Sequence, residues 1–171
     1  MPVLLLNPPS TTDLLPNREG TASFGAMSTG FLYPPHTLAV ILAALREAEI
    51  DAGLVDAVGE EIGLEETIDR VRALQPDLLG VYASWGTLDV DKQAISALRA
   101  AFPQTPIVAL GTGVRYNGED LLAAGASHML AGDPELAFAR LASGPLPEPG
   151  VIKAHDLLPD EHNYAGLLRH P

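Results

Sequence analysis

The sequence predicts an α/β fold in which five parallel strands form a doubly wound sheet with helices on both faces. Short apolar runs alternate with helical patterns along the first 143 residues, and this alternation is typical of repeated β–α units. The runs are apolar throughout, which indicates strands buried on both faces. Right-handed crossovers and a flavodoxin-like arrangement give the expected strand order 2-1-3-4-5.

The five strands are predicted at apolar runs bounded by turn residues, and they cover residues 3–7, 51–56, 78–84, 105–111 and 128–132. The helices are predicted from apolar residues at three- and four-residue spacing, over residues 36–49, 63–75, 88–103, 117–125 and 133–142. Pro76 ends the second helix, Gly125 closes the fourth, and Pro134 suits the first turn of the fifth. Asp89 or Asp91 is suited to cap the third helix.

Length and composition indicate one folded domain, residues 1–143, followed by a tail or linker rich in proline and glycine, residues 144–171. The formal net charge of −12 is unfavourable for nucleic-acid binding. We expect no membrane span and no signal peptide, because no apolar run has the length or the flanks that these need. A cytoplasmic protein fits this composition best.

The chain contains no cysteine. This excludes a disulfide framework, a thiolate nucleophile, a cysteine zinc site and an iron–sulfur cluster on this chain. Asp133 and Glu135 follow the last predicted strand, but they are equally suited to be helix-start charges. We therefore expect no catalysis by this chain alone.

Small and polar residues follow the predicted strands at their carboxyl ends, over residues 7–10, 83–87, 111–114 and 132–133. In a doubly wound sheet, ligands bind beyond these ends, near the point between the first and third strands. Glycines and hydroxyl side chains there suit amide, ribose or phosphate groups. The alternative is that these residues only form tight turns.

Three well-known nucleotide and phosphate folds fit poorly. Gly111 and Gly113 follow the fourth strand, and Gly118 comes too late to complete a dinucleotide-binding motif. A receiver domain would need an aspartate at the end of the third strand, where this chain has Ala83 and Ser84. A flavodoxin would need a phosphate loop after the first strand, where prolines remove the N–H donors.

Five segments in order resemble the cobalamin-binding domain: "VLLLNPP", "YPPHTLAVILAALREAEIDAGLVDA", "QPDLLGVYAS", "PIVALGTG" and "GDPELAFARL". They are most similar to the version that precedes the radical S-adenosylmethionine domain in methyltransferases and in cyclases of the magnesium-protoporphyrin ester type. The resemblance runs from Val3 to about Leu141, and "HDLLPDEHNY" resembles the connector into the radical domain. It implies a cobalamin whose dimethylbenzimidazole tail is withdrawn from cobalt and buried in the crevice.

The resemblance also implies roles for individual residues. The tail pocket would be lined by Ser84, Trp85, Gly86 and Thr87. Approach of the nucleotide loop to the backbone would be allowed by Gly111, Thr112 and Gly113. The far side would be flanked by Gly132 and Asp133, and the floor below the ring would be formed by Asn7, Pro8 and Pro9. For Trp85, capping of the core is the alternative.

The chain departs from the family pattern after the first strand, where it lacks the Asp-x-His-x-x-Gly loop whose histidine ligates cobalt. "PPHT" stands where "PPLG" is usual, so His36 is a candidate axial ligand for cobalt or iron, or a donor to a propionate or corrin amide. The alternative is a solvent-facing residue at a helix start. Residues 17–37 form a long predicted loop over the ligand position. Phe24, Met27 and Tyr33 give it apolar surface, for a tetrapyrrole, for another domain, or for packing on the protein itself.

Three hypotheses follow for function. The first is a cobalamin-binding module that serves a radical S-adenosylmethionine or methyltransferase domain, either on a partner protein or on a missing C-terminal part. The second is a binder of another tetrapyrrole, such as haem or a chlorophyll precursor, in the same crevice. The third is a ligand-free domain that acts in protein interaction or homodimerisation.

Overall fold

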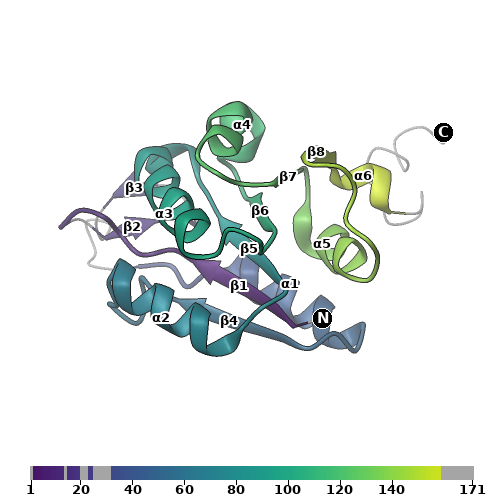
Figure 1. Cartoon of the computed structure of the whole chain (residues 1–171). Helices are drawn as coiled ribbons and strands as arrows, with labels where there is room; N and C mark the ends of the chain where they lie inside the picture. The colour runs from purple at the N-terminus through teal and green to yellow at the C-terminus, as the bar shows by residue number, and fades with distance from the viewer. Residues whose placement is uncertain (1, 14, 20–22, 25–31, 159–171) are drawn as a thin grey trace.

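The computed structural model describes residues 2–13, 15–19, 23–24 and 32–158, and it shows a parallel sheet between two layers of helices (Figure 1). The strands of the sheet are β1 (Val3–Asn7), β4 (Ala52–Asp56), β5 (Leu78–Tyr82), β6 (Ile107–Leu110), β7 (His128–Ala131) and β8 (Gly150–Lys153). Every pairing in this sheet is parallel. The predicted α/β class with a parallel sheet is therefore confirmed.

The main helices are α1 (His36–Glu47), α2 (Leu64–Leu74), α3 (Leu88–Ala101), α4 (Val114–Ala123), α5 (Pro134–Ala142) and α6 (Ala154–Leu157). A separate pair of short strands, β2 (Pro16–Asn17) and β3 (Ser23–Phe24), is antiparallel. The 3₁₀ turn η1 (Trp85–Thr87) leads directly into α3.

Two apolar cores lie on opposite faces of the sheet. One core packs α1 and α5 against the sheet, with Leu38 and Phe138 fully buried. The other packs α2, α3 and α4 against the opposite face, with Val71, Ile95 and Leu121 fully buried. Because β1 and β5 lie between these layers, all of their residues are buried, as expected for parallel strands covered on both faces.

The predicted count of five strands is wrong, whereas the five predicted strands lie in the expected relative order 2-1-3-4-5, as β4-β1-β5-β6-β7. The sheet has six strands in the order β4-β1-β5-β6-β7-β8, and β8 comes from the segment predicted to be a tail. This edge strand buries Ile152 while Val151 and Lys153 are exposed, so it lacks the apolar run that marks the inner strands. The division of the chain after residue 143 stays a prediction. After that residue, β8 adds a strand to the sheet and α6 follows it directly.

Helix α4 begins three residues before the predicted start, at Val114, directly after the glycines that follow β6. Asn117 has φ −132° and ψ 31°, which are not helical angles. The helix is thus kinked at the residue where the sequence pattern indicated that it would begin.

Candidate functional site

The carboxyl ends of β1 and β5 lie side by side, since Leu6 of β1 pairs with Val81 of β5. From these two ends the chain continues to opposite faces of the sheet, to α1 after β1 and to α3 after β5 (Figure 1). Doubly wound proteins bind their ligands between two such connections, and this position is here called the crevice. The fold therefore has the topological feature at which the ligand was predicted to bind, and binding there stays a prediction.

A buried ion pair joins the two sides of this position. Arg18, in the segment after β1, donates from Nε and Nη2 to Asp91 Oδ1 at 2.8 and 2.6 Å. The side chains of Arg18 and Asp91 are 1% and 0% exposed. Arg18 Nη1 also donates to the Asn7 side-chain oxygen at 3.1 Å and to the Pro8 carbonyl at 2.7 Å.

The second oxygen of Asp91 holds the loop between β5 and α3. Asp91 Oδ2 accepts from the Ser84 backbone N–H and from the Thr87 hydroxyl, both at 2.8 Å. Ser84 Oγ lies 2.8 Å from Thr87 Oγ1. Because an ionised carboxylate only accepts, the single hydroxyl proton of Thr87 goes to Asp91. Ser84 must then donate to Thr87, which leaves Ser84 Oγ with acceptor capacity only.

The network continues to the outer strand β4 through Asn7. The Asn7 amide nitrogen donates to Asp56 Oδ1 at 2.7 Å, and the same oxygen accepts the Gly59 N–H at 3.0 Å. Asn7 thus uses both ends of its carboxamide, one for Arg18 and one for Asp56. Four elements around the crevice are held together by one connected set of polar groups.

Burial raises the pKa of the Asp91 carboxyl, and the Arg18 guanidinium beside it acts in the opposite direction. The two bonds from Ser84 and Thr87 act in the same direction as Arg18. All of these contacts come from donors, so the geometry fits the ionised carboxylate. The charge of Asp91 therefore depends on Arg18.

This dependence predicts how an Arg18→Met variant responds to pH. Without the guanidinium, the folded-state pKa of Asp91 rises further above its unfolded value of about 3.9. The folded state then binds more protons, so its stability decreases as pH rises toward the folded-state pKa. We expect the loss of unfolding free energy, relative to wild type, to be about 1 kcal/mol or more larger near pH 8 than near pH 5.

Urea unfolding of both proteins at the two pH values measures this difference. The exposed Arg46 of α1 provides the control, because an Arg46→Met variant should show the same small change at both pH values. An Arg18→Met deficit that is equal at both pH values, or larger near pH 5, would contradict the expected role of Asp91.

Glu19, next to Arg18, forms hydrogen bonds with the start of α1, on the side of the crevice opposite to α3. Its carboxylate accepts the Thr37 N–H at 2.9 Å and the Thr37 hydroxyl at 3.4 Å. Thr37 lies in the first turn of α1, where backbone N–H groups have no partner within the helix. The N-cap residue Pro35 makes no side-chain hydrogen bond to them. Glu19 therefore supplies an acceptor, and its negative charge suits the start of a helix. Burial raises the pKa of the nearby Tyr82 hydroxyl, and the Glu19 charge raises it further.

Asn17, in the segment after β1, has a buried side chain that lacks hydrogen-bond partners. The residue is 1% exposed, and neither its amide oxygen nor its amide nitrogen has a hydrogen-bond partner. A buried carboxamide normally pairs both groups. Asn17 therefore offers a donor and an acceptor beside the crevice.

The predicted glycines after β6 face the protein's own backbone. Gly111 has φ +101°, and a Cβ there would lie 2.6 Å from the Ala83 carbonyl oxygen. A Cβ at Gly113 would lie 3.0 Å from the Ser84 carbonyl carbon. Both glycines thus allow the β6–α4 loop to pack closely on the β5–α3 loop. Their contact with a ligand stays a prediction.

The remaining predicted residues divide by exposure. Pro8, Pro9, Ser84 and Thr87 are buried, and Gly86 is half-buried. The exposed group consists of Trp85, Thr112, Gly132, Asp133, Tyr33 and His36. Phe24 lies in β3, and Met27 lies outside the described residues. The structure therefore brings an exposed rim and a buried polar floor to the same edge of the sheet.

His36 is the first residue of α1 and is exposed, which leaves its proposed role as an axial ligand open to test. Within the described ranges, no three His, Asp or Glu side chains gather as a metal site. Among the helices in the described part of the chain, none is long and apolar enough to cross a membrane.

Sequence reasoning missed Arg18, Asp56 and the role of Asp91. Asp91 had one visible signal, its position near the start of α3, but Asp89 was an equal candidate for that role. The structure separates them, since Asp91 is buried in the network and Asp89 is exposed. Arg18 gave no signal, because its partner is 73 residues away.

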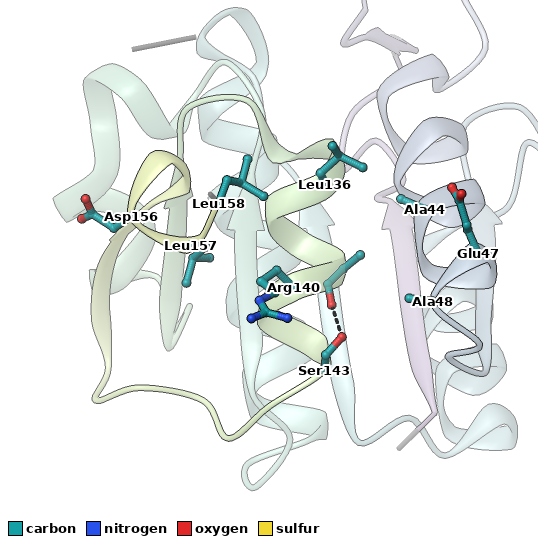
Figure 2. A pocket seen from close by; sticks show the side chains of 10 residues that line it. Ala44, Glu47, Ala48, Leu136, Arg140, Ser143, Asp156, Leu157 and Leu158 are labelled. Atoms are coloured by element: carbon teal, nitrogen blue, oxygen red, sulfur yellow. Dashed lines mark hydrogen bonds between the residues drawn. The ribbon is translucent and has the colours of Figure 1, made fainter. Parts of the chain in front are cut away.

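A hollow of about 710 Å³ lies elsewhere, between α1, α5 and α6 (Figure 2). Its lining includes Leu136 of α5, Leu157 and Leu158 at the end of the described chain, and Ala44 and Ala48 of α1. None of its lining residues was predicted to bind a ligand. It is separate from the site at the strand ends.

The fold and the crevice define a class: doubly wound α/β domains that bind a ligand beyond the carboxyl ends of parallel strands. Within that class, the family model of the B12 binding domain matches residues 23–142. The chain belongs to the B12-binding domain family, as the sequence resemblance indicated, and cobalamin is the cofactor of that family.

Solved structures show the same fold. The radical S-adenosylmethionine methyltransferase TsrM from Kitasatospora setae, solved with tryptophan substrate and an S-adenosylmethionine analogue bound, matches with a TM-score of 0.61 and 17% identity. The match covers 83% of this chain and 25% of that chain, so this chain spans about a quarter of the enzyme's length. A CheY-like protein, tadZ, from Pseudomonas aeruginosa matches with a TM-score of 0.54, 19% identity and coverage of 86% and 98%. A comparison with curated proteins gives no significant match.

Proposed function

We propose that this chain is a cobalamin-binding module that serves a radical S-adenosylmethionine or methyl-transfer domain. The observation that carries the proposal is the rim of exposed residues after β5, β6 and β7, in a chain of the B12-binding domain family. Trp85 is 59% exposed, and the small or polar residues Thr112 and Gly132 are exposed after the next two strands of the sheet. A flat macrocycle with amide side chains needs such a surface, with an aromatic face and nearby polar groups.

The residues present fit the cofactor at the rim. Trp85 and Tyr33 offer exposed aromatic surface at the rim. The Asn17 carboxamide is buried rather than part of the rim, and its unpaired groups are a donor and an acceptor for an amide that reaches it. Thr112 and Asp133 would hold other peripheral groups of the ring. When bound, cobalamin supplies a cobalt ion that can carry and release an alkyl group.

We further propose that the cofactor binds with its dimethylbenzimidazole tail withdrawn from cobalt. Support comes from the end of β1 and the residues that follow it, Asn7, Pro8 and Pro9, where the chain lacks the Asp-x-His-x-x-Gly loop with its cobalt-ligating histidine. Ser84 and Thr87 would line the pocket for the tail. His36 is proposed to contact the metal or a ring substituent, and its exposure at the start of α1 leaves the imidazole accessible.

The partner is proposed from two observations. The fold resembles part of a radical S-adenosylmethionine methyltransferase, and the absence of cysteine means that an iron–sulfur cluster on a Cys-x-x-x-Cys-x-x-Cys motif must come from elsewhere. The chain's own contribution would then be to bind and orient the cofactor for the partner's chemistry.

Retention of hydroxocobalamin after desalting tests this function, with haemin as the competing pigment. We expect wild type to retain cobalamin with the spectrum of the tail-off form, and Trp85→Ala to weaken binding about tenfold through loss of aromatic contact. Leu74→Ala, at an exposed residue of α2, is the matched control and should bind like wild type. Loss of cobalamin from wild type, or retention of haem with dependence on His36, would overturn the proposal.

A further inference from the structure

Arg18 occupies the position where a ligand of this fold class enters. Its guanidinium bridges the Pro8 carbonyl, just after β1, and the Asp91 carboxylate of α3. These are the two connections whose divergence forms the crevice. With its side chain 1% exposed, Arg18 fills the space between them.

Ser84 and Thr87, which were predicted to line the tail pocket, already form hydrogen bonds with each other and with Asp91. Asp91 Oδ2 takes the bonds from Ser84 and Thr87, and Asp91 Oδ1 takes both bonds from Arg18. Ser84 and Thr87 are 0% and 1% exposed. A ligand cannot reach these groups while the Arg18 side chain remains between β1 and α3.

We propose that Arg18 is a displaceable plug, which must leave Asp91 before the nucleotide tail of the cofactor can enter the crevice. This inference rests on the proposed function and adds a step to it. In the closed arrangement Arg18 pairs with Asp91. In the open arrangement the Asp91 carboxylate and the Ser84 hydroxyl oxygen face the ligand.

The plug also selects the chemistry of the ligand. Once Arg18 leaves, Asp91 retains a buried negative charge and needs new hydrogen-bond donors. Ser84 Oγ has acceptor capacity only, as long as Thr87 donates to Asp91. The group that replaces Arg18 must therefore carry N–H or O–H donors, as the ribose hydroxyls of the nucleotide tail do, and the phosphate of the tail is disfavoured beside Asp91.

Stopped-flow fluorescence of Trp85, the single tryptophan of the chain, can follow binding of hydroxocobalamin. The test variant is Arg18→Met/Asp91→Asn, which removes both charges together and keeps an acceptor for Ser84 and Thr87. We expect its association rate constant to rise at least tenfold. The control Glu66→Gln/Arg70→Met removes an exposed ion pair of α2 and should leave the rate unchanged. A folded test variant with an unchanged or lower rate would overturn the plug.

A second measurement uses the wild-type chain. The Arg18 Nε–H, bonded to Asp91, should exchange slowly with solvent in ¹⁵N spectra and should lose its protection when excess hydroxocobalamin is added. The Arg99 Nε–H, bonded to the Gly125 carbonyl at 2.8 Å and remote from the crevice, is the internal control. If cobalamin is retained and the Arg18 signal is unchanged, the plug is wrong and the proposed function stands. If neither wild type nor the double variant retains cobalamin, the proposed function itself fails.

Discussion

Replacing Asp91 with alanine is expected to lower the free energy of unfolding by about 3–5 kcal/mol, because it leaves a buried guanidinium without its counter-charge. The Ser84 N–H and the Thr87 hydroxyl lose their acceptor in the same step, and each unsatisfied buried donor adds to the loss. The change should be visible in urea or thermal unfolding followed by far-ultraviolet circular dichroism.

The matched control lies two residues earlier on the same helix. Asp89 is exposed and pairs with Lys92 at the surface, so Asp89→Ala should change stability far less. The double variant Arg18→Met/Asp91→Asn should recover much of the loss, since both charges are removed together. If Asp89→Ala and Asp91→Ala destabilise equally, the ion pair does not have the buried character assigned to it.

Replacing Phe138 with alanine is expected to destabilise the domain by about 3–5 kcal/mol, because the fully buried ring leaves a cavity between α5 and the sheet. Phe138 is 0% exposed and lies directly over Gly80 of β5. A Cβ at Gly80 would come within 2.7 Å of the Phe138 ring and 2.8 Å of Leu5. The missing side chain at Gly80 therefore makes room for the ring.

The close fit between Gly80 and the Phe138 ring can also be tested by enlarging the side chain at Gly80. Gly80→Ala alone should overpack the core and cost about 1–3 kcal/mol, whereas Gly80→Ala combined with Phe138→Leu should cost less than the sum of the single changes. Leu136→Ala, at a half-exposed residue of the same helix, is the control and should have a small effect. Strict additivity at residues 80 and 138 would contradict the packing described.

The elements that sequence patterns predicted well are those whose signal is local. The buried strands β1 and β5 consist of apolar residues because helices cover both of their faces, and this composition is visible without any knowledge of partners. Edge strand β8 was missed for the complementary reason. Only Ile152 in it is buried, and the surrounding prolines and glycines resemble a linker.

The candidate site was predicted in position but not in its internal connections. The position follows from topology, since doubly wound sheets bind ligands at the carboxyl ends of their strands, where the connections pass to opposite faces. The contents of the crevice do not follow from topology. Asp89 and Asp91 are both aspartates near the start of a helix, so the sequence does not distinguish them. Only the packing shows that Asp89 faces solvent and that Asp91 faces Arg18.

The amino-acid sequence by itself determined the α/β class, the inner strands, the edge of the sheet at which ligands of this fold class bind, and the family. Each of these depends on periodicity, composition or ordered short segments, which are properties of neighbours along the chain. The tertiary structure alone decided the sixth strand, the burial of Ser84 and Thr87, and the pairing of Arg18 with Asp91. A buried ion pair between residues 73 positions apart has no local pattern, because its stability comes from desolvation and hydrogen bonds that exist only after the chain has folded.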